Sequence, residues 1–341
     1  MPRKTKMNSI TTPELLSQVN PQNINLLNDF VDYLHSVQRS EETIKGYIND
    51  IQIAWVWSLK YNNNMFYCDW TKRQIVRYQN WLINENQNSP ARIKRLKAAL
   101  SSLGNFVESV LDDEFPNFRN IINKIESPVN QPVRDKTVFE DEQIEFLLKT
   151  LTDKKQFDKA CALALALCSG RRKSELLRFR VSDFDDDKLV CGNSLYKSSP
   201  IKTKGRGVNG KQLECFCLAK KFRPYLNNWL KYRDEHNIKS EWLFPDKDDP
   251  TKQMSISTLN SWAKTFSRIL GVDFYWHAMR HMTVTNFKRA GIPDTVIQKY
   301  IGWEDISMVP VYVDMQADEQ ISMYFNEDGI VTPKAKGLSE I

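Results

Sequence analysis

The sequence contains no apolar stretch long enough to cross a membrane. The run at residues 160–168 stops far short of the roughly 18–20 apolar residues that a membrane helix needs. The basic N-terminus is not followed by the apolar segment of a secretory signal. These absences predict an intracellular, cytoplasmic protein with no membrane partner.

Cysteines and histidines in metal-binding arrangements are also missing. None of the six cysteines forms a Cys-x-x-Cys pair, and the four histidines stand at no metal-ligand spacing relative to them. Cys215 and Cys217 fall in an alternating run, where strand packing explains them better than a metal does. We therefore expect reduced thiols, no bound metal and no cofactor.

Charge of one sign is not in large excess. Lys and Arg outnumber Asp and Glu by 48 to 42, a net charge of +6, and the hydrophobic content of 41% is that of an ordinary globular protein. Local basic runs say more than the total, because a polyanionic partner is bound by clustered cations. One run comprises Arg92, Lys94, Arg95 and Lys97, and another, with no acid inside it, comprises Lys197, Lys202, Lys204, Arg206 and Lys211.

Prolines and apolar periodicity divide the chain of 341 residues into two domains and three short segments. Two prolines among few apolar residues mark a linker at residues 126–138. Before it we expect a flexible segment at 1–21 and a helical domain at 22–125. After it we expect a second domain at 139–325 and a C-terminal tail at 326–341.

The first domain is helical throughout by its apolar spacing at three and four residues. Ser40 and Ser89-Pro90 are N-cap signals for the second and fourth of four helices, and Asp69 or Thr71 opens the third. The basic run 92–97 falls in the first turns of the fourth helix. From this helix alone, a DNA-binding face and a merely solvated face are equally good interpretations.

The second domain combines helices with a minor β element. Helices are expected near residues 140–151, 157–168, from 172, 219–234, 257–270, 277–290 and 293–301, and strands at 188–190, 194–202 and 211–218. The predicted fold class is mainly α with a small antiparallel β-sheet.

Three motifs in this domain carry side chains suited to phosphate chemistry. Arg172 follows a glycine break at a helix start, and Glu175 lies one turn further on, where it can hold the guanidinium. His277 and Arg280 share a helical face, and an indole and a phenol follow at Trp303 and Tyr312. Taken singly, the motifs have plainer explanations: a basic surface turn, a packed ring beside an ion-pair partner, and two core aromatics.

In combination, the motifs resemble the tyrosine recombinase (phage integrase) family, of the two-domain Cre/Xer-like type. That family has a Gly-x-Arg-x-x-Glu box, a hairpin lysine, a His-x-x-Arg-His box, and a Leu-Gly-His/Trp element whose last residue stands nine positions before a tyrosine. The matching positions are Gly170, Arg172, Glu175, Lys202, His277, Arg280, His281, Ile301-Gly302-Trp303 and Tyr312. Trp303 replaces the commoner histidine, and the arm-binding domain of large integrases is missing unless residues 1–21 serve as a reduced version.

The resemblance implies a four-helix, SAM-like core DNA-binding domain followed by a tyrosine-recombinase catalytic domain. It implies that Tyr312 attacks a DNA phosphate, which gives a 3′-phosphotyrosyl link and a 5′-hydroxyl without ATP. Arg172 and Arg280 would neutralise the charge of the transition state, and Trp303 would donate a further hydrogen bond.

The resemblance also implies which residues would transfer protons. Lys202 is the expected general acid for the leaving 5′-oxygen, with Lys204 as its rival. His277 would assist deprotonation of the nucleophile or hold the phosphate. Two further residues, Glu175 and His281, would orient their neighbours.

The implied partners are a double-stranded DNA site with inverted repeats and further copies of the chain. A tetramer on DNA, passing through a Holliday junction, is expected from a monomer or weak oligomer in solution, with host or phage DNA-bending proteins as accessory factors. DNA contacts are expected from Arg92, Lys94, Arg95, Lys97, Lys204 and Arg206. The segment after the tyrosine would dock on a neighbouring protomer or on its own domain.

Two other functions share these residues. A non-cleaving DNA-binding regulator or accessory factor could use the same fold, although the intact catalytic set argues against it. A type IB topoisomerase or a telomere resolvase would use the same chemistry, but both are usually larger.

Overall fold

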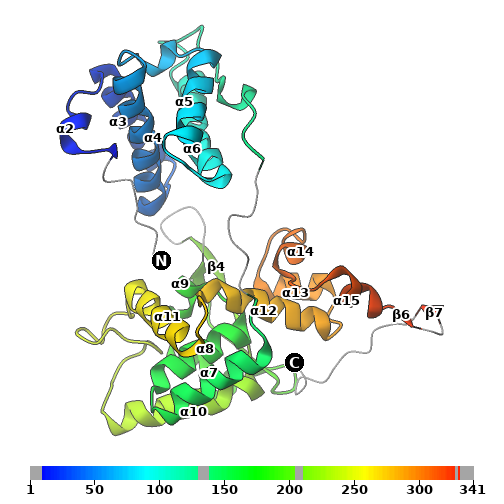
Figure 1. Ribbon diagram of the computed structural model, residues 1–341. Helices are drawn as coiled ribbons and strands as arrows, with labels where there is room; N and C mark the ends of the chain where they lie inside the picture. Colours follow the sequence, from blue (N-terminus) through cyan, green and yellow to red (C-terminus); the bar gives the residue numbers. More distant parts are fainter. Residues whose placement is uncertain (1–9, 130–137, 204–209, 327–328, 331–341) are drawn as a thin grey trace. The chain divides into compact units, whose positions relative to one another are not determined.

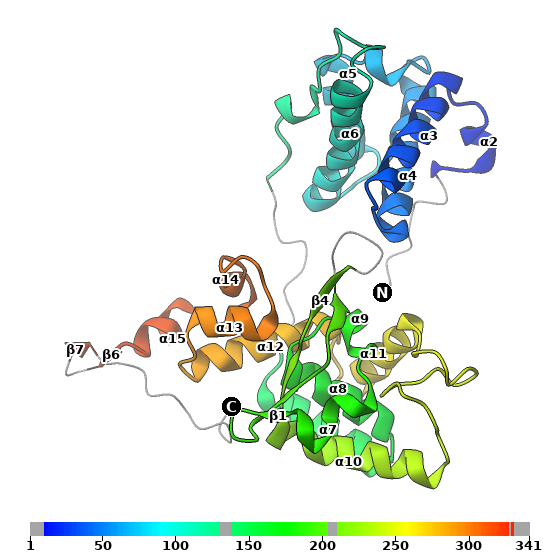
Figure 2. The ribbon, with the colours of Figure 1, turned by 180° about the vertical axis from the view of Figure 1, so that it is seen from behind.

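The computed structural model describes residues 10–129, 138–203, 210–326 and 329–330. The chain divides into two compact units, residues 1–135 with 206–208, and residues 136–205 with 209–341 (Figures 1 and 2). Two predicted DNA contacts, Lys204 and Arg206, lie outside the described residues, as do most of the predicted linker and tail.

The first unit is a helical bundle in which three helices begin at the predicted N-caps, whereas the short helix α2 falls inside the segment 1–21 that was expected to be flexible. Its elements are α2 (Pro13–Leu16), α3 (Pro21–Ser36), α4 (Glu41–Tyr61), α5 (Lys72–Asn84) and α6 (Pro90–Val110), with 3-10 turns at Tyr67–Asp69 and Ile122–Lys124. Side-chain oxygens of Ser40, Thr71 and Ser89 accept N–H groups at the starts of α4, α5 and α6. The three N-cap predictions are therefore confirmed.

The basic run at the start of α6 divides into surface and interior residues. Arg92 and Arg95 both pair with the buried carboxylate of Asp50, at 2.7 and 2.9 Å, and Lys94 is exposed. Lys97 is 4% exposed, and its ammonium donates to Gln79 Oε1 at 2.8 Å and to the carbonyl oxygen of Ile125 at 2.6 Å. The predicted DNA contact from Lys97 is therefore wrong, because this cation ties α6 to the end of its own unit.

The second unit is organised around one helix that is buried almost throughout. The helices are α7 (Asp141–Asp153), α8 (Phe157–Ser169), α9 (Lys173–Leu176), α10 (Ala219–Glu235), α11 (Ile256–Leu270), α12 (Trp276–Arg289), α13 (Asp294–Ile301), α14 (Met308–Tyr312) and α15 (Ala317–Ser322). The Ala- and Leu-rich α8 packs against α7, α10 and α12 (Figures 1 and 2). It is the scaffold from which the site described below is built.

Short antiparallel strands complete this unit. The strands are β1 (Leu189–Val190), β2 (Leu195–Lys197), β3 (Ile201–Thr203), β4 (Lys211–Leu213), β5 (Phe216–Leu218), β6 (Phe325–Asn326) and β7 (Gly329–Ile330). They form a sheet β1-β2-β5, a hairpin β3-β4 and a pair β6-β7. The fold class, mainly α with a small antiparallel sheet, is confirmed.

The predicted single three-stranded sheet is wrong in one respect, because two long strands are each broken. Between β2 and β3, Ser199 N–H donates to Asp183 and Pro200 has no N–H to give to a ladder. The Ser198 hydroxyl accepts the N–H of Cys215 at the matching break between β4 and β5. The breaks detach β3-β4 as a separate hairpin, and this hairpin carries Lys202.

Candidate active site

The C-terminal end of α8 joins the two halves of the site. The last carbonyls of a helix have no partner within the helix. Here Leu167 O accepts Thr283 Oγ1 at 2.7 Å, Cys168 O accepts Tyr300 Oη at 2.5 Å, and Gly170 O accepts Arg280 Nη1 at 3.0 Å. Side chains from α12 and α13 thus cap α8, and they bring residues more than 100 positions apart into contact.

Gly170 makes the turn from α8 to α9 possible. Its φ is +60°, a left-handed conformation that favours glycine. A Cβ at this position would lie 2.5 Å from Ile301 Cδ1, so α13 approaches the backbone where a side chain would block it. The turn delivers Arg172 to the start of α9.

Arg172 is held by the carboxylate that the sequence predicts for it. Arg172 Nη1 lies 2.9 Å from Glu175 Oε1, and Glu175 Oε2 accepts the Arg172 backbone N–H at 3.1 Å. Glu175 is buried, whereas about a third of the Arg172 side chain is exposed. A buried acid therefore aims a partly accessible guanidinium, as phosphate binding requires.

Arg280 is a fully buried cation that lies against two neighbouring aromatic rings. Its guanidinium carbon lies 4.9 Å from the centroid of the Trp303 ring and 5.5 Å from that of Tyr312. Burial, followed by the positive charge of Arg172, lowers the pKa of Arg280 to about 10. Its Nε and Nη2 and the Nε1 of Trp303 are buried and lack hydrogen-bond partners within the described ranges. These donors are suited to an anion.

Tyr312 stands at the centre of an aromatic cluster. Ring centroids of His277, His281 and Trp303 lie 5.2, 4.4 and 4.8 Å from that of Tyr312. Tyr312 ends α14, and α14 packs against both α12 and α13. The structure therefore gathers the predicted nucleophile and both histidines around Arg280 and Trp303.

The two histidines differ in their surroundings. His277 is exposed on the first turn of α12. His281 is buried and stacked on Tyr312, with Nδ1 3.4 Å from a carboxylate oxygen of Asp314. Asp314 is itself held, because its N–H donates to Thr285 Oγ1 at 2.9 Å. An acid that orients His281 was not predicted; its position two residues after Tyr312 was the available signal.

Lys202 is exposed on β3, and the hairpin that carries it is fastened to the Trp303 segment. Lys211 Nζ on β4 pairs with Glu304 at 2.7 Å. Gly302, with φ +72°, lies against Leu213, so that a Cβ there would come within 2.8 Å of Leu213 Cδ1. Two contacts thus couple the hairpin to the loop between α13 and α14.

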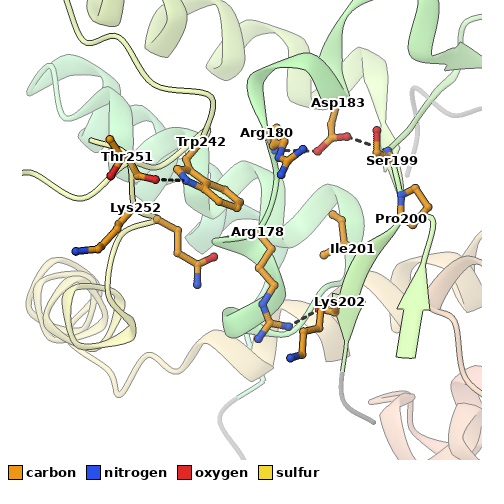
Figure 3. Close-up of a pocket in the computed structure, with 11 residues that line it drawn as sticks. Arg178, Arg180, Asp183, Ser199, Pro200, Ile201, Lys202, Trp242, Thr251 and Lys252 are labelled. Atoms are coloured by element: carbon orange, nitrogen blue, oxygen red, sulfur yellow. Dashed lines mark hydrogen bonds between the residues drawn. The ribbon is translucent and has the colours of Figure 1, made fainter. Parts of the chain in front are cut away.

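A cavity of about 620 Å³ adjoins Lys202 (Figure 3). Arg178, Arg180, Trp242 and Lys252 line it with Lys202, and the Arg178 guanidinium donates to the carbonyl oxygen of Lys202. Of the six predicted catalytic residues, only Lys202 is part of its wall. The cavity is therefore separate from the aromatic cluster around Tyr312.

Arg171 is a buried cation that was not predicted to have a role. It is 2% exposed, and its Nη2 donates to the carbonyl oxygen of Tyr300 at the end of α13. The sequence shows it only as one member of a basic turn. Its burial could not be foreseen, because it depends on a helix that begins 123 residues later.

No cluster of histidine, cysteine and acidic side chains able to hold a metal occurs in the described part of the chain. No helix among the described residues is long and apolar enough to span a membrane.

The fold and the arrangement of this site are those expected for the tyrosine recombinase (phage integrase) family. Residues 137–319 match the model of the phage integrase family, and residues 26–117 match that of the phage integrase N-terminal SAM-like domain. The first match alone spans more than half of the chain, and the protein belongs to the phage integrase family.

Individual relatives agree with this assignment. The chain is 27% identical over 323 residues to the SPbeta prophage-derived recombinase-like protein YomM of Bacillus subtilis (strain 168), covering 91% of this chain and 92% of that protein. Its fold is similar to that of XerH site-specific recombinase bound to palindromic difH substrate, with a TM-score of 0.64, 17% identity, and coverage of 93% and 91%. A lambda integrase (75–356) dimer bound to a COC' core site gives a TM-score of 0.61, 14% identity, and coverage of 86% and 95%.

Proposed function

We propose that this protein is a site-specific DNA recombinase that cleaves and rejoins strands through a 3′-phosphotyrosyl intermediate. The observation that carries the proposal is the cluster around Tyr312. One phenol stands among two imidazoles, an indole and a buried guanidinium whose unpartnered donors are suited to an anion. A DNA phosphate supplies that anion, and the phenol supplies the nucleophile.

The proposed cleavage step exchanges one phosphodiester for another. Tyr312 Oη forms a bond to phosphorus, the bond from phosphorus to the 5′-oxygen breaks, and His277 takes the phenolic proton. Lys202 gives a proton to the leaving 5′-oxygen. Attack by the 5′-hydroxyl of a second strand reverses these transfers, so the reaction consumes no ATP.

Charge stabilisation is assigned to three donors. Arg172 and Arg280 bind the non-bridging oxygens, on which charge develops, and Trp303 Nε1 adds a hydrogen bond. Such donors act strongly in a site that excludes water, because they are already oriented. The burial of the Arg280 side chain and of Trp303 Nε1 supports this assignment.

The DNA partner is proposed to be a recombination site with inverted repeats, bound by four copies of the chain and exchanged through a Holliday junction. Lys94, together with Arg92 and Arg95, supplies phosphate contacts from the first unit. Lys204 and Arg206 are also proposed to contact DNA phosphates. Segment α15, which exposes Ile321, is proposed to dock on a second copy.

A suicide DNA substrate, nicked so that cleavage releases a short fragment, tests the proposal. The wild-type protein should form a denaturant-resistant complex with the DNA. Tyr312→Phe should bind the same DNA with unchanged affinity and form none. A covalent complex from Tyr312→Phe would refute the assignment of the nucleophile.

The suicide substrate and supercoiled DNA together separate the other functions. A non-cleaving regulator would form no covalent complex with the suicide substrate, even as the wild-type protein. A type IB topoisomerase would relax supercoiled DNA that lacks the recombination site, whereas the proposed recombinase requires paired sites.

A further inference from the structure

Arg178 contacts the backbone of the proposed general acid. Its Nη1 donates to the carbonyl oxygen of Lys202, which lies 24 positions further along the chain (Figure 3). We propose that Arg178 is a positioning residue, which places Lys202 for protonation of the leaving 5′-oxygen. The inference rests on the function proposed above and adds a residue that neither the motifs nor the comparisons assign.

The hairpin needs such a brace on the side of β3. A two-stranded hairpin is marginally stable by itself, and β3 has three residues and pairs only with β4 in the described part of the chain. On β4, Lys211 and Leu213 fix the hairpin to the segment 302–304. On β3, the guanidinium of Arg178 fixes the peptide group of Lys202 itself.

Arg178 also connects the general acid to the phosphate-binding arginine. Arg172 and Arg178 lie at the two ends of the short α9 segment, and the Arg178 N–H donates to Glu175 O at 3.0 Å. Glu175, which orients Arg172, is buried in the middle of this segment. One small rigid piece therefore sets both the cation that binds the phosphate and the strand that carries the acid.

A direct contact from Arg178 to DNA is the main alternative. Arg178 lines the cavity beside Lys202, and cations in such a position can bind phosphate. The two roles differ in what they change. A phosphate ligand contributes to DNA affinity, whereas a positioning residue affects the proton transfer and leaves the affinity unchanged.

A matched control comes from the same cavity wall. Arg180 carries the same charge two residues further on, but its guanidinium lies 5.3 Å from the Trp242 ring centroid and 3.5 Å from a carboxylate oxygen of Glu241. Arg180→Ala removes a cation from the cavity without removing a donor to Lys202. It should leave strand cleavage unchanged.

The test compares ordinary suicide DNA with DNA that carries a 5′-bridging phosphorothiolate, whose sulfur leaves without a proton. On ordinary DNA, Arg178→Ala should cleave about 10- to 100-fold more slowly, which is less than the roughly 10²–10⁴-fold loss expected without any general acid, because Lys202 itself is retained. On the phosphorothiolate it should cleave within about threefold of the wild-type rate, as should Lys202→Ala. Arg178→Lys, which keeps a donor, should retain an intermediate rate on ordinary DNA.

The outcomes are separable. A defect of Arg178→Ala that persists on the phosphorothiolate, or a loss of DNA affinity that accounts for it, overturns the inference and leaves the recombinase intact. Full activity of Arg178→Ala on ordinary DNA also overturns it. No covalent complex from the wild-type protein refutes the proposed function instead. If Arg178→Ala does not fold, Arg178→Met, which keeps the length of the side chain and removes the donor, is measured on both substrates against the same criteria.

Discussion

Arg280 combines a catalytic assignment with an unfavourable environment. The side chain is fully buried, and its pKa falls from 12.5 to about 10 because burial disfavours the charged form. Below pH 10 the folded protein bears the full cost of this buried charge. As the pH rises, the folded state loses the proton before the unfolded state does, so stability increases.

The change Arg280→Met tests this environment. The variant should lose strand cleavage by about 100-fold or more, because a preorganised donor is removed. Without DNA, the stability of the wild-type protein relative to the variant should rise between about pH 9 and about pH 11. Urea unfolding over this range checks the sign; a constant or falling difference would contradict it.

Trp303 offers a second test of a single donor. Its Nε1 is buried without a partner in the described part of the chain, while its ring packs on Tyr312 and Arg280. Trp303→Phe keeps a smaller aromatic ring and removes the N–H, so cleavage should fall by about 100-fold with unchanged DNA affinity.

Trp303→His is the companion variant, because it retains an N–H donor. Its cleavage rate should lie between those of Trp303→Phe and the wild-type protein. Equal rates for the two variants would show that the ring, not the N–H, matters at this position.

The residues at which helices start could be predicted from the sequence. The breaks in the strands and the ion-pair partners of the basic residues could not. N-cap oxygens such as those of Ser40 and Ser89 act within three residues, so local sequence reveals them. The breaks in the β strands depend on Asp183 as well as on the local Pro200, and the pairing of Arg92 and Arg95 depends on Asp50; both acids are distant in the sequence.

The burial of Lys97, by contrast, could have been predicted from its spacing in the sequence. It follows Ile93 by four residues and precedes Leu100 by three, which places it on the buried stripe of α6. The candidate catalytic residues could be proposed from the sequence as a set, but the distances between them could not. Those distances depend on the contacts of α8 with α12 and α13.

The coupling of the β3-β4 hairpin to the loop between α13 and α14 can be tested at Gly302. Gly302→Ala places a Cβ 2.8 Å from Leu213 Cδ1 at a φ of +72°, and it should lower stability by about 1–3 kcal/mol and slow cleavage. Adding Leu213→Ala should recover part of the cleavage rate by removing the steric clash.

Gly271→Ala is the matched control for Gly302→Ala. Gly271 has a φ of +71°, but a Cβ at this position would have no described atom within 4 Å apart from its immediate chain neighbours. The variant should lose stability through the backbone alone and keep its cleavage rate. A cleavage defect in Gly271→Ala equal to that of Gly302→Ala would contradict the coupling.

The proposed assembly on DNA would use surfaces that a single copy leaves exposed. Segment α15 is held to α12 by Arg289 and Glu319, 2.7 Å apart, yet Ile321 is 56% exposed and Tyr324 is 43% exposed. Replacing Ile321 and Tyr324 together by serine should leave Tyr312-dependent cleavage of an isolated suicide site intact. Tetrameric complexes, counted by mass photometry, should fall by about tenfold, since exposed apolar anchors dominate such interfaces. Unchanged assembly would place the docking surface elsewhere.

The capping of α8 by Thr283, Tyr300 and Arg280 also has a kinetic consequence. Each of these contacts closes a loop of more than 100 residues, and such long-range contacts form slowly. During refolding from urea, helical signal should therefore return before the ability to become covalently attached to DNA. Capture of Tyr312 by a suicide substrate at successive times would report the moment at which the active site closes.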